Sequence, residues 1–373
     1  MRVALDVSAV PPRVAGAGRY VVELATRLPA LGVETTLVTR RDDARRWREW
    51  SPGSLLAPVV PSRRVARLVD EAWRLGTSAT ARTAEVWHGP HYTMPRRGMT
   101  PTVVTIHDLT FFTNPEWHER SKVAFFRRAI GYSARHAKVL ISVSEFTARQ
   151  IEEFIPEHAP IVVAPHGVDL AHFSASDTND AALFTARGLP VDVPYVFFVG
   201  TFEPRKGIDV LLEAFEELSS SDATLELWLA GQPGWGQGEI ERSLGTHRAA
   251  SRIRRLGFVD ESVLAALMRR ARAVAYPSRG EGFGLPVLEA LASGASVVTS
   301  SDTVMAEVAL DAALLVGAGD ASALAGALAT LLGEDDARRH ARALGARARA
   351  EMFTWEASMT RHLAAYELAT GTR

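Results

Sequence analysis

Two glutamates eight residues apart flank a glycine-rich turn in the segment EGFGLPVLE, residues 281–289. Gly282 and Gly284 allow the backbone to turn, so we expect Glu281 in the turn and Glu289 about one turn into a helix. A carboxylate only accepts hydrogen bonds, and a vicinal diol can supply a donor to each of its oxygens. Since a helix N-terminus also favours an anion, the segment predicts a site for hydroxyl groups beside a phosphate.

Adjacent cations occur in a second segment, TFEPRKG, residues 201–207. Arg205 and Lys206 follow an apolar run typical of a strand and precede a predicted helix, where they could neutralise a diphosphate. The alternative is a solvent-facing loop, but ligands of parallel sheets bind at the carboxyl ends of strands, which favours the functional interpretation. A nucleotide sugar would supply phosphates for the cations, ribose for one glutamate and sugar hydroxyls for the other.

Two further places could approach such a ligand. Gly16 and Gly18 open the first predicted helix, but Val21 stands where a dinucleotide fingerprint needs its third glycine, so an ordinary turn is the alternative. His107 and Asp108 end an apolar run, and the alternative there is a satisfied core histidine and an aspartate that caps the next turn.

The sequence gives little support for a metal site or for a cysteine or serine nucleophile. His88 and His91 have the spacing of a metal pair, but the sequence offers no evident third ligand, and we expect no metal site. Neither a P-loop nor a G-x-S-x-G segment occurs, and the chain has 0 cysteines. The sequence lacks a long apolar span and a signal-peptide pattern, so we expect a cytoplasmic protein.

Apolar runs of strand length alternate with helical patterns along all 373 residues, which predicts an α/β protein with parallel sheets. The runs fall into two sets separated by a polar stretch, and the length favours two domains. The predicted strands are 3–10, 33–39, 100–108, 137–144, 159–165, 193–200, 224–231, 252–259, 273–278 and 295–300.

Charge is divided unevenly between the two halves. Residues 1–172 hold 23 Lys and Arg against 17 Asp and Glu, whereas the remainder holds 19 against 26. Basic side chains mix with aromatic ones in residues 40–50 and 120–138. This half could meet an anionic membrane surface or a phosphate-bearing acceptor, and the alternative is a solvated helical face.

Together these segments resemble glycosyltransferase family 4, whose members retain the anomeric configuration, and bacterial mannosyltransferases in particular. The block EGFGLPVLEALASG is the most specific part, and the resemblance extends over nearly the whole chain. The other matching segments are GAGRY, VTIHDLTF, SVSEFTARQI, PHGVD, VGTFEPRKG, LGFVDES, YPSRG and FTWEASMTRHLAAYE. The resemblance implies the GT-B fold, in which two Rossmann-like parallel-sheet domains face a central cleft.

The resemblance also implies a domain plan. The acceptor-side domain would span 1–172, the linker 173–194 and the nucleotide-sugar-binding domain 195–352. A C-terminal helix within 353–373 would cross back to the first domain.

Site residues follow from the same resemblance. Those implied in catalysis are His107, Arg205, Lys206 and Glu281. Those implied in donor binding are Gly16, Gly18, Arg205, Lys206, Glu281, Gly282, Phe283, Gly284, Leu285 and Glu289. Glu289 would hold the ribose, Glu281 the donor sugar, and Arg205 with Lys206 the diphosphate. His107 would approach the transferred sugar, and the loop at Gly16–Gly18 would close over the donor.

Two departures from the family pattern bear on the donor. Thr201 stands where many relatives carry Arg, which would leave more of the phosphate binding to Arg205. The segment Thr303–Leu310 lacks the second Ser, the Pro and the Gly of the family's S-S-L-P-E-V-x-G segment.

We therefore expect a retaining hexosyltransferase that uses no metal or other cofactor. Its partners would be a nucleotide-sugar donor, GDP-mannose first and a UDP-sugar such as UDP-glucose second, and a saccharide or lipid-linked acceptor. We expect no nucleic-acid partner, and a cytoplasmic location that could be peripheral to the inner face of the membrane. The alternatives are a GT-B epimerase or phosphorylase and a non-catalytic regulator that binds nucleotide sugars.

Overall fold

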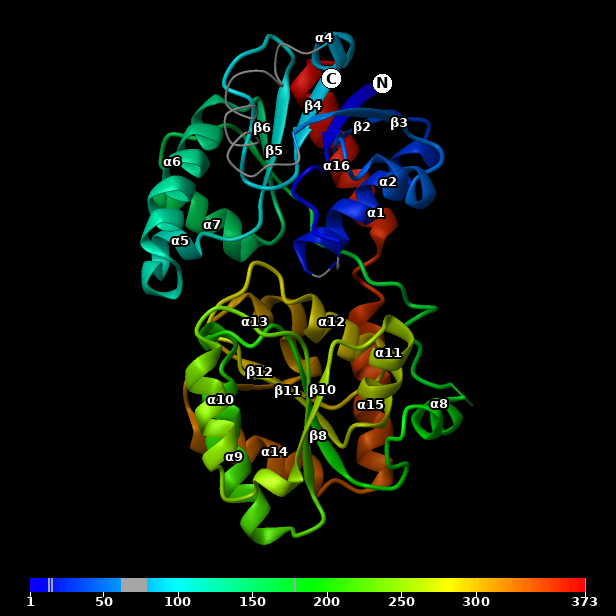
Figure 1. The fold of residues 1–373 in the computed structure, drawn as a ribbon, viewed down its shortest axis with the longest axis vertical. Coiled ribbons are helices and arrows are strands. Elements are labelled where there is room, and N and C mark those ends of the chain that lie inside the picture. The colour runs from blue at the N-terminus through cyan, green and yellow to red at the C-terminus, as the bar shows by residue number, and fades with distance from the viewer. Residues whose placement is uncertain (13, 15, 62–78, 178, 373) are drawn as a thin grey trace. The chain divides into compact units, whose positions relative to one another are not determined.

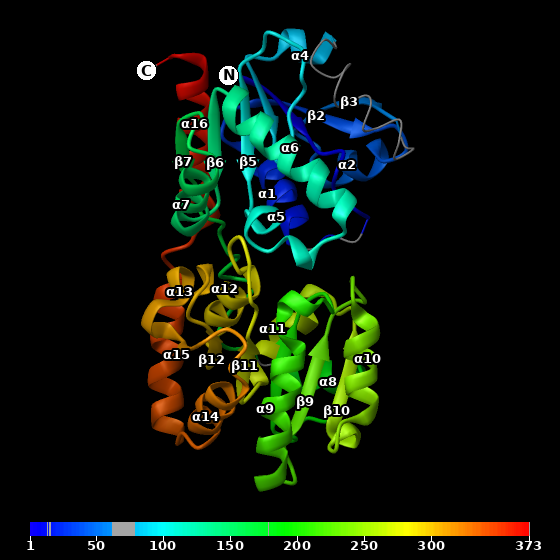
Figure 2. The ribbon, with the colours of Figure 1, turned by 90° about the vertical axis from the view of Figure 1, so that its left-hand side faces the viewer.

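The computed structural model describes residues 1–12, 14, 16–61, 79–177 and 179–372, and the chain forms two units (Figures 1 and 2). The first unit comprises Met1–Gly167 and Trp355–Arg373, and the second comprises Val168–Thr354. Each unit contains one fully parallel sheet, which confirms the predicted pair of Rossmann-like domains.

The boundary between the units differs from the one expected from the sequence. The first unit ends at Gly167, before the expected residue 172, and residues 173–194 belong to the second unit instead of forming a linker. This segment contains helix α8 (Asp180–Ala186), and Asp180 accepts two hydrogen bonds from Arg269, at 2.7 and 2.8 Å. Both side chains are less than 10% exposed, so a buried ion pair ties α8 to α11 (Glu261–Arg270).

The first unit is built on a seven-stranded sheet with the order β3-β2-β1-β4-β5-β6-β7. Its strands are β1 (Arg2–Asp6), β2 (Glu34–Arg40), β3 (Leu55–Val60), β4 (Val86–Gly89), β5 (Thr102–Ile106), β6 (Val139–Ser142) and β7 (Ile161–Val163). Its helices are α1 (Ala17–Ala30), α2 (Ala44–Trp50), α4 (Ala79–Thr83), α5 (Thr110–Thr113), η2 (Pro115–Trp117), α6 (Arg120–His136), α7 (Glu145–Phe154) and α16 (Trp355–Thr370).

Successive side chains of the strands point to opposite faces of this sheet, and a core cluster covers each face. Val3 and Leu5 of β1 join the core cluster that includes α1 and α16, whereas Ala4 joins a cluster on the opposite face. Helix α16 contributes Trp355 and Tyr366 to the first of these clusters. It lies beside β6 and β7, as Figure 2 shows, and also contacts β4 and β5.

The second unit is built on a six-stranded sheet with the order β10-β9-β8-β11-β12-β13. Its strands are β8 (Tyr195–Val199), β9 (Glu226–Ala230), β10 (Ile253–Gly257), β11 (Ala273–Tyr276), β12 (Val297–Ser300) and β13 (Leu314–Val316). Besides α8 and α11, its helices are η3 (Pro204–Lys206), α9 (Ile208–Ser221), α10 (Gln237–Thr246), η4 (Ala250–Arg252), α12 (Leu285–Ala292), α13 (Val304–Ala309), η5 (Leu310–Ala312), α14 (Ala321–Leu332) and α15 (Asp336–Ala350).

The position of the strand-order reversal decides where a ligand can bind. In the second sheet the order runs outward from β8 through β9 to β10 on one side and from β11 to β13 on the other. The reversal lies between β8 and β11, and doubly wound sheets bind ligands at the carboxyl edge beside such a reversal. The loops that follow β8 and β11 carry Arg205, Lys206 and Glu281.

No helix in the described part of the chain is both long and apolar enough to span a bilayer.

Burial of histidines should make the first unit sensitive to acid. Burial lowers the pKa of His88, His107, His166 and His362 below the ordinary value of 6.5, to about 4 for His362. The unfolded chain therefore binds more protons below pH 6.5, and stability is lost as the pH falls from 6.5 towards the folded pKa values. In that window each histidine should lower the free energy of unfolding by roughly 1.4 kcal/mol per pH unit.

Urea unfolding between pH 7.5 and 5 measures this loss. Carboxylates with lowered pKa values, such as Glu281, lose their contribution only below the ordinary value of 4.5, outside the window. The free energy of unfolding should fall steeply from pH 6.5 to pH 5 and stay level from pH 7.5 to pH 7. A level profile down to pH 5 would contradict the neutral, buried state of these rings.

Candidate active site

The loops after β8 and β11 are joined by close backbone contacts. Gly207 has a φ of 69°, and a Cβ atom there would lie 2.1 Å from the carbonyl oxygen of Pro277, so only glycine fits. The amide of Arg279 and the hydroxyl of Ser278 both donate to the carbonyl oxygen of Arg205, at 2.7 and 3.0 Å. These contacts fix the cationic loop against the loop that carries Glu281.

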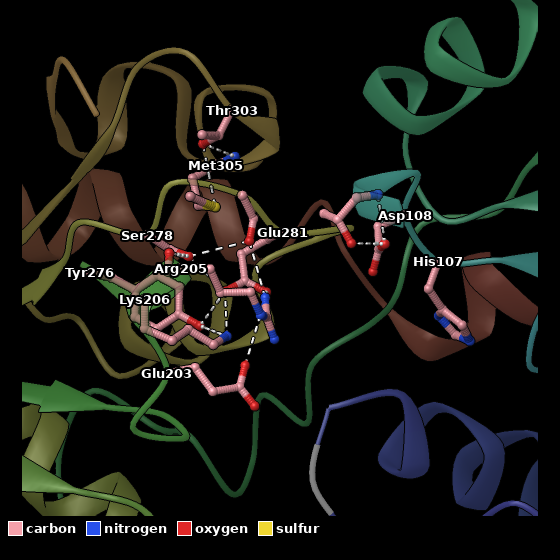
Figure 3. A network of polar contacts seen from close by, with 12 residues as sticks. His107, Asp108, Glu203, Arg205, Lys206, Tyr276, Ser278, Glu281, Thr303 and Met305 are labelled. Atoms are coloured by element: carbon pink, nitrogen blue, oxygen red, sulfur yellow. Dashed lines mark hydrogen bonds and ion pairs between the residues drawn. The ribbon is translucent and has the colours of Figure 1, made fainter. Parts of the chain in front are cut away.

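Glu281 lies at the centre of a polar network in the second unit (Figure 3). Its Oε2 accepts from Arg205 Nη1 at 3.0 Å, and its Oε1 accepts from the Lys206 ammonium group. The Tyr276 hydroxyl also donates to Oε1 at 3.0 Å, and Ser278 Oγ lies 2.9 Å from Oε1, its single proton shared between Oε1 and the Arg205 carbonyl oxygen. Among the described residues Oε2 accepts only from Arg205, which makes it the oxygen with capacity for a ligand hydroxyl.

The network keeps its members charged although they are buried. The Lys206 and Glu281 side chains are 8% and 12% exposed. Burial alone would raise the pKa of Glu281, but Lys206 and Arg205 outweigh it and hold the pKa at about 2. Burial and the Arg205 charge lower the pKa of Lys206, and Glu281 acts in the opposite direction. Glu281 therefore compensates two cations that a diphosphate could also engage.

Arg205 is oriented by more than Glu281. Its Nε donates to Glu203 at 2.9 Å and its Nη1 to the carbonyl oxygen of Gly280 at 3.1 Å. Lys206 Nζ also donates to the Tyr276 hydroxyl at 2.9 Å. A guanidinium and an ammonium group held by such partners are preorganised for an anion, because little ordering remains to be done on binding.

Helix α12 positions the other predicted donor-binding residues. Gly284 precedes the helix with a φ of 90°, and the helix begins at Leu285. Glu289 lies just beyond the first turn and is 5% exposed, while Phe283 is 4% exposed and Gly282 is partly exposed. The side chain of Met305, from α13, approaches the position of a Cβ on Gly284 to 3.1 Å, so the segment that departs from the family pattern borders this turn.

His107 is held in one tautomer at the end of β5. Its Nε2 lies 2.8 Å from the carbonyl oxygen of Pro90, so Nε2 carries a proton and donates it. Burial lowers the pKa of His107, which leaves the ring neutral and its Nδ1 an acceptor. Nδ1 has no hydrogen-bond partner among the described residues, so it is available to a hydroxyl donor.

Asp108 has the structural role that the sequence offered as an alternative. One carboxylate oxygen accepts from the Thr110 amide and hydroxyl at 3.0 and 2.6 Å, and the other accepts from the Tyr92 hydroxyl at 2.8 Å. Figure 3 shows His107 and Asp108 as neighbours at the end of this strand. Asp108 therefore shapes the loop that carries His107.

Gly16 and Gly18 lie at the start of α1. Gly16 precedes the helix with φ 49° and ψ −120°, a conformation that strongly favours glycine, and Gly18 is buried in the first turn. Their neighbours Arg13 and Ala15 lie outside the described residues.

His88 uses both ring nitrogens within the protein. Nδ1 is 2.8 Å from the Tyr366 hydroxyl and Nε2 is 2.8 Å from the Thr105 hydroxyl. The described residues contain no group of three or more potential metal ligands. Both nitrogens of His88 are therefore engaged by hydroxyls within the core of the first unit.

Several partners of the predicted residues were not evident from the sequence. Tyr276 and Ser278 hold Glu281, and Glu203 holds Arg205. All three lie within five residues of a predicted site residue in the same loops, which was the available signal. Their direction towards the network depends on the order of the strands.

Comparison with known proteins agrees with this architecture. Residues 14–172 match the family described as Glycosyltransferase Family 4, and residues 193–334 match the one described as Glycosyl transferases group 1. O-antigen chain mannosyltransferase B of Escherichia coli is 31% identical over 284 residues, which cover 76% of this chain and 74% of that protein. D-inositol 3-phosphate glycosyltransferase of Kineococcus radiotolerans is 30% identical over 407 residues, which cover 96% and 91%.

A solved structure supports the fold over its full length. Sucrose-phosphate synthase of Thermosynechococcus elongatus superposes with a TM-score of 0.80 at 21% identity, covering 100% of both chains. With two parallel-sheet units, relatives at 30–31% identity and the matching family segments, the chain belongs to glycosyltransferase family 4 and has the GT-B fold.

Proposed function

We propose that this glycosyltransferase is retaining and metal-independent and transfers a mannosyl group from GDP-mannose to a saccharide or lipid-linked acceptor in glycan biosynthesis. The observation that carries the proposal is the buried network of Arg205, Lys206 and Glu281 beside the strand-order reversal. The relative named as an O-antigen chain mannosyltransferase supports the choice of sugar and of a glycan acceptor.

The proposed reaction assigns a task to each group. The bond between the sugar C1 and the diphosphate oxygen breaks, and the acceptor oxygen bonds to C1 on the same face. The acceptor proton passes to the departing diphosphate, as the family resemblance implies. Arg205 and Lys206 stabilise the charge that grows on the diphosphate. Glu289 holds the ribose. Glu281 Oε2 and His107 Nδ1 accept hydrogen bonds from hydroxyls of the sugar.

A UDP-sugar such as UDP-glucose is the second candidate donor. The segment Thr303–Leu310 departs from the family pattern, and its Met305 borders Gly284 at the turn before α12. A changed side chain at that turn could change which donor fits.

Thermal-shift measurements with GDP-, UDP- and ADP-sugars test the choice of donor, because a ligand that binds the folded state stabilises it by mass action. GDP-mannose should give the largest shift, and incubation with an acceptor should release GDP. Conversion of the donor alone into its epimer would favour an epimerase. Binding without release of nucleotide in the presence of any acceptor would favour a regulator.

Metal removal should leave activity intact. The two cations of the network supply the positive charge that a divalent ion would otherwise bring to the diphosphate. Activity in excess EDTA should equal that in buffer. Complete loss in EDTA with recovery on adding Mn²⁺ would overturn the metal-free assignment.

Helix α6 is the proposed contact with an anionic membrane. Arg120 and Arg128 are exposed on it, and Phe125 is 40% exposed between them. Arg127 instead donates to the carbonyl oxygen of Phe111 at 2.7 Å, so it is a poorer probe of binding. Binding to vesicles that contain anionic phospholipid should weaken steeply with salt and with the double substitution of Arg120→Gln and Arg128→Gln.

The control removes the same charge elsewhere. Arg338→Gln with Arg361→Gln changes two exposed arginines on α15 and α16 and should leave vesicle binding unchanged. Equal weakening by both double variants, or binding that salt does not affect, would leave α6 as a solvated face.

A further inference from the structure

A buried chain of polar side chains crosses the first unit and is anchored on α16 at both ends. Five hydrogen bonds of 2.7–2.8 Å connect its members. In order they are Tyr366, His88, Thr105, Tyr20, His362 and the carbonyl group of Ser358. Each of these residues is at most 2% exposed. The chain joins α16 to β4, β5 and α1, elements that are far apart in the sequence.

The donor-to-acceptor direction of the hydrogen-bond chain is set by its end at the Ser358 carbonyl group. His362 Nδ1 lies 2.7 Å from the Ser358 carbonyl oxygen, which can only accept, so Nδ1 carries the proton. Burial lowers the pKa of His362 to about 4, so the ring is neutral and Nε2 is an acceptor. Tyr20 must therefore donate its hydroxyl proton to Nε2, over 2.8 Å.

The remaining links then have one consistent arrangement. Since Tyr20 donates to His362, its oxygen accepts from the Thr105 hydroxyl at 2.7 Å. Thr105 has used its only proton, so it accepts from His88 Nε2 at 2.8 Å. Burial lowers the pKa of His88, so its Nδ1 is an acceptor for the Tyr366 hydroxyl at 2.8 Å. Every donor in the chain has an acceptor, as buried polar groups require.

The middle of this hydrogen-bond chain lies beside the functional residues of this unit. The ring of Tyr20 packs edge-on against His107, with the centroids 5.3 Å apart. Thr105 lies two residues before His107 on the strand that leads to it, so both point to the same face of the sheet. Tyr20 also lies two residues after Gly18 in the first turn of α1. Removing one hydroxyl from the chain would release constraints on both His107 and α1.

We propose that Tyr20 is a positioning residue for glycosyl transfer, held by this one-directional chain so that its ring fixes the orientation of His107. The inference rests on the proposed role of His107 at the donor sugar. Tyr20 itself touches neither substrate nor reacting atoms in this scheme, and helix α16 acts through it.

Tyr20→Phe removes the hydroxyl and keeps the ring. We expect kcat to fall about 10-fold, because a small misplacement of a group at the reacting centre is costly, while the donor KM changes by less than about 3-fold. Thr105→Val breaks the neighbouring link and should reproduce this loss, whereas Thr105→Ser keeps the hydroxyl and should restore activity. Wild-type kcat in the Tyr20→Phe and Thr105→Val variants would overturn the inference.

A matched control separates positioning from lost stability. Tyr195 in the second unit is also buried and donates its hydroxyl to the carbonyl oxygen of Leu267 at 2.8 Å. Tyr195→Phe removes a comparable buried hydrogen bond and should leave kcat unchanged. An equal fall in kcat for Tyr195→Phe and Tyr20→Phe would show a general effect of destabilisation and overturn the inference.

A double-mutant cycle separates this inference from the proposed function. His107→Ala should itself lower kcat, and Tyr20→Phe should then add less than about 2-fold, because residues acting through one another are not additive. A full 10-fold further loss in the His107→Ala background would overturn the role of Tyr20. Wild-type kcat for His107→Ala would overturn the proposed role of His107 instead.

The direction of the chain can be read in the unmodified protein. Nitrogen-15 NMR of the histidine rings at pH 7.5 should show His88 protonated on Nε2 and His362 protonated on Nδ1. This measurement needs no substituted protein to fold. The opposite tautomer at either ring would contradict the direction assigned to these hydrogen bonds.

Discussion

Replacing Lys206 by methionine should lower kcat by about 10²- to 10³-fold, because it removes a preorganised charge that stabilises the leaving diphosphate in the proposed reaction. Methionine is similar in length, so the substitution leaves no large cavity. Glu281 would retain Arg205 as its only cationic partner in the network. Loss of one partner from a buried ion pair should also lower the free energy of unfolding, by up to about 3 kcal/mol.

Steady-state kinetics of the folded variant check this expectation. Lys138 is exposed directly before β6, and Lys138→Met provides a lysine-to-methionine control outside the network, for which we expect unchanged kcat. A Lys206→Met enzyme that keeps its fold and retains kcat within about 3-fold of the wild type would show that Lys206 is structural.

Glu281→Gln and Glu289→Gln should have different kinetic effects. Glu281→Gln should lower kcat by roughly 10-fold or more, a loss above about 1.4 kcal/mol, because Glu281 contacts both cations and, in the proposed reaction, orients the transferred sugar. Glu289 would hold the ribose before and during the reaction, which is uniform binding. Glu289→Gln should therefore raise the donor KM more than it lowers kcat.

The affinity for sugar-free nucleoside diphosphate distinguishes the two roles further. Glu281 compensates Arg205 and Lys206, so its neutralisation leaves more positive charge for the diphosphate. Affinity for the nucleoside diphosphate should stay level or rise in Glu281→Gln and fall in Glu289→Gln. If Glu281→Gln weakens that affinity and Glu289→Gln leaves it alone, the two roles are reversed.

The fold was largely predictable because most strands are continuous apolar runs. Three strands were not predicted: β3 with its internal Pro58, β4 with the sequence VWHG, and β13 with three residues. Each is too short or too interrupted for periodicity alone to identify it. The segment 173–194 looked like a linker because it is polar, whereas the ion pair of Asp180 with Arg269 places its helix in the second unit.

The site was predictable only in part, for a physical reason. The segments with Arg205, Lys206 and Glu281 stand out through their charges and glycines after apolar runs. Their contact depends on β8 lying beside β11, a pairing that no local pattern encodes. The link between Tyr20 and His362 spans 342 residues, so only the folded chain reveals it.

The central claim is that Arg205 and Lys206 form the diphosphate site of a nucleotide-sugar donor. Calorimetric titration of GDP and UDP into the wild-type and Lys206→Met proteins tests it most directly. We expect one site per chain in the wild type, with tighter binding of GDP, and affinity at least about 10-fold weaker in Lys206→Met, since charge-assisted bonds to phosphate are the strong ones. Equal affinity of the two folded proteins for both nucleotides would contradict the claim.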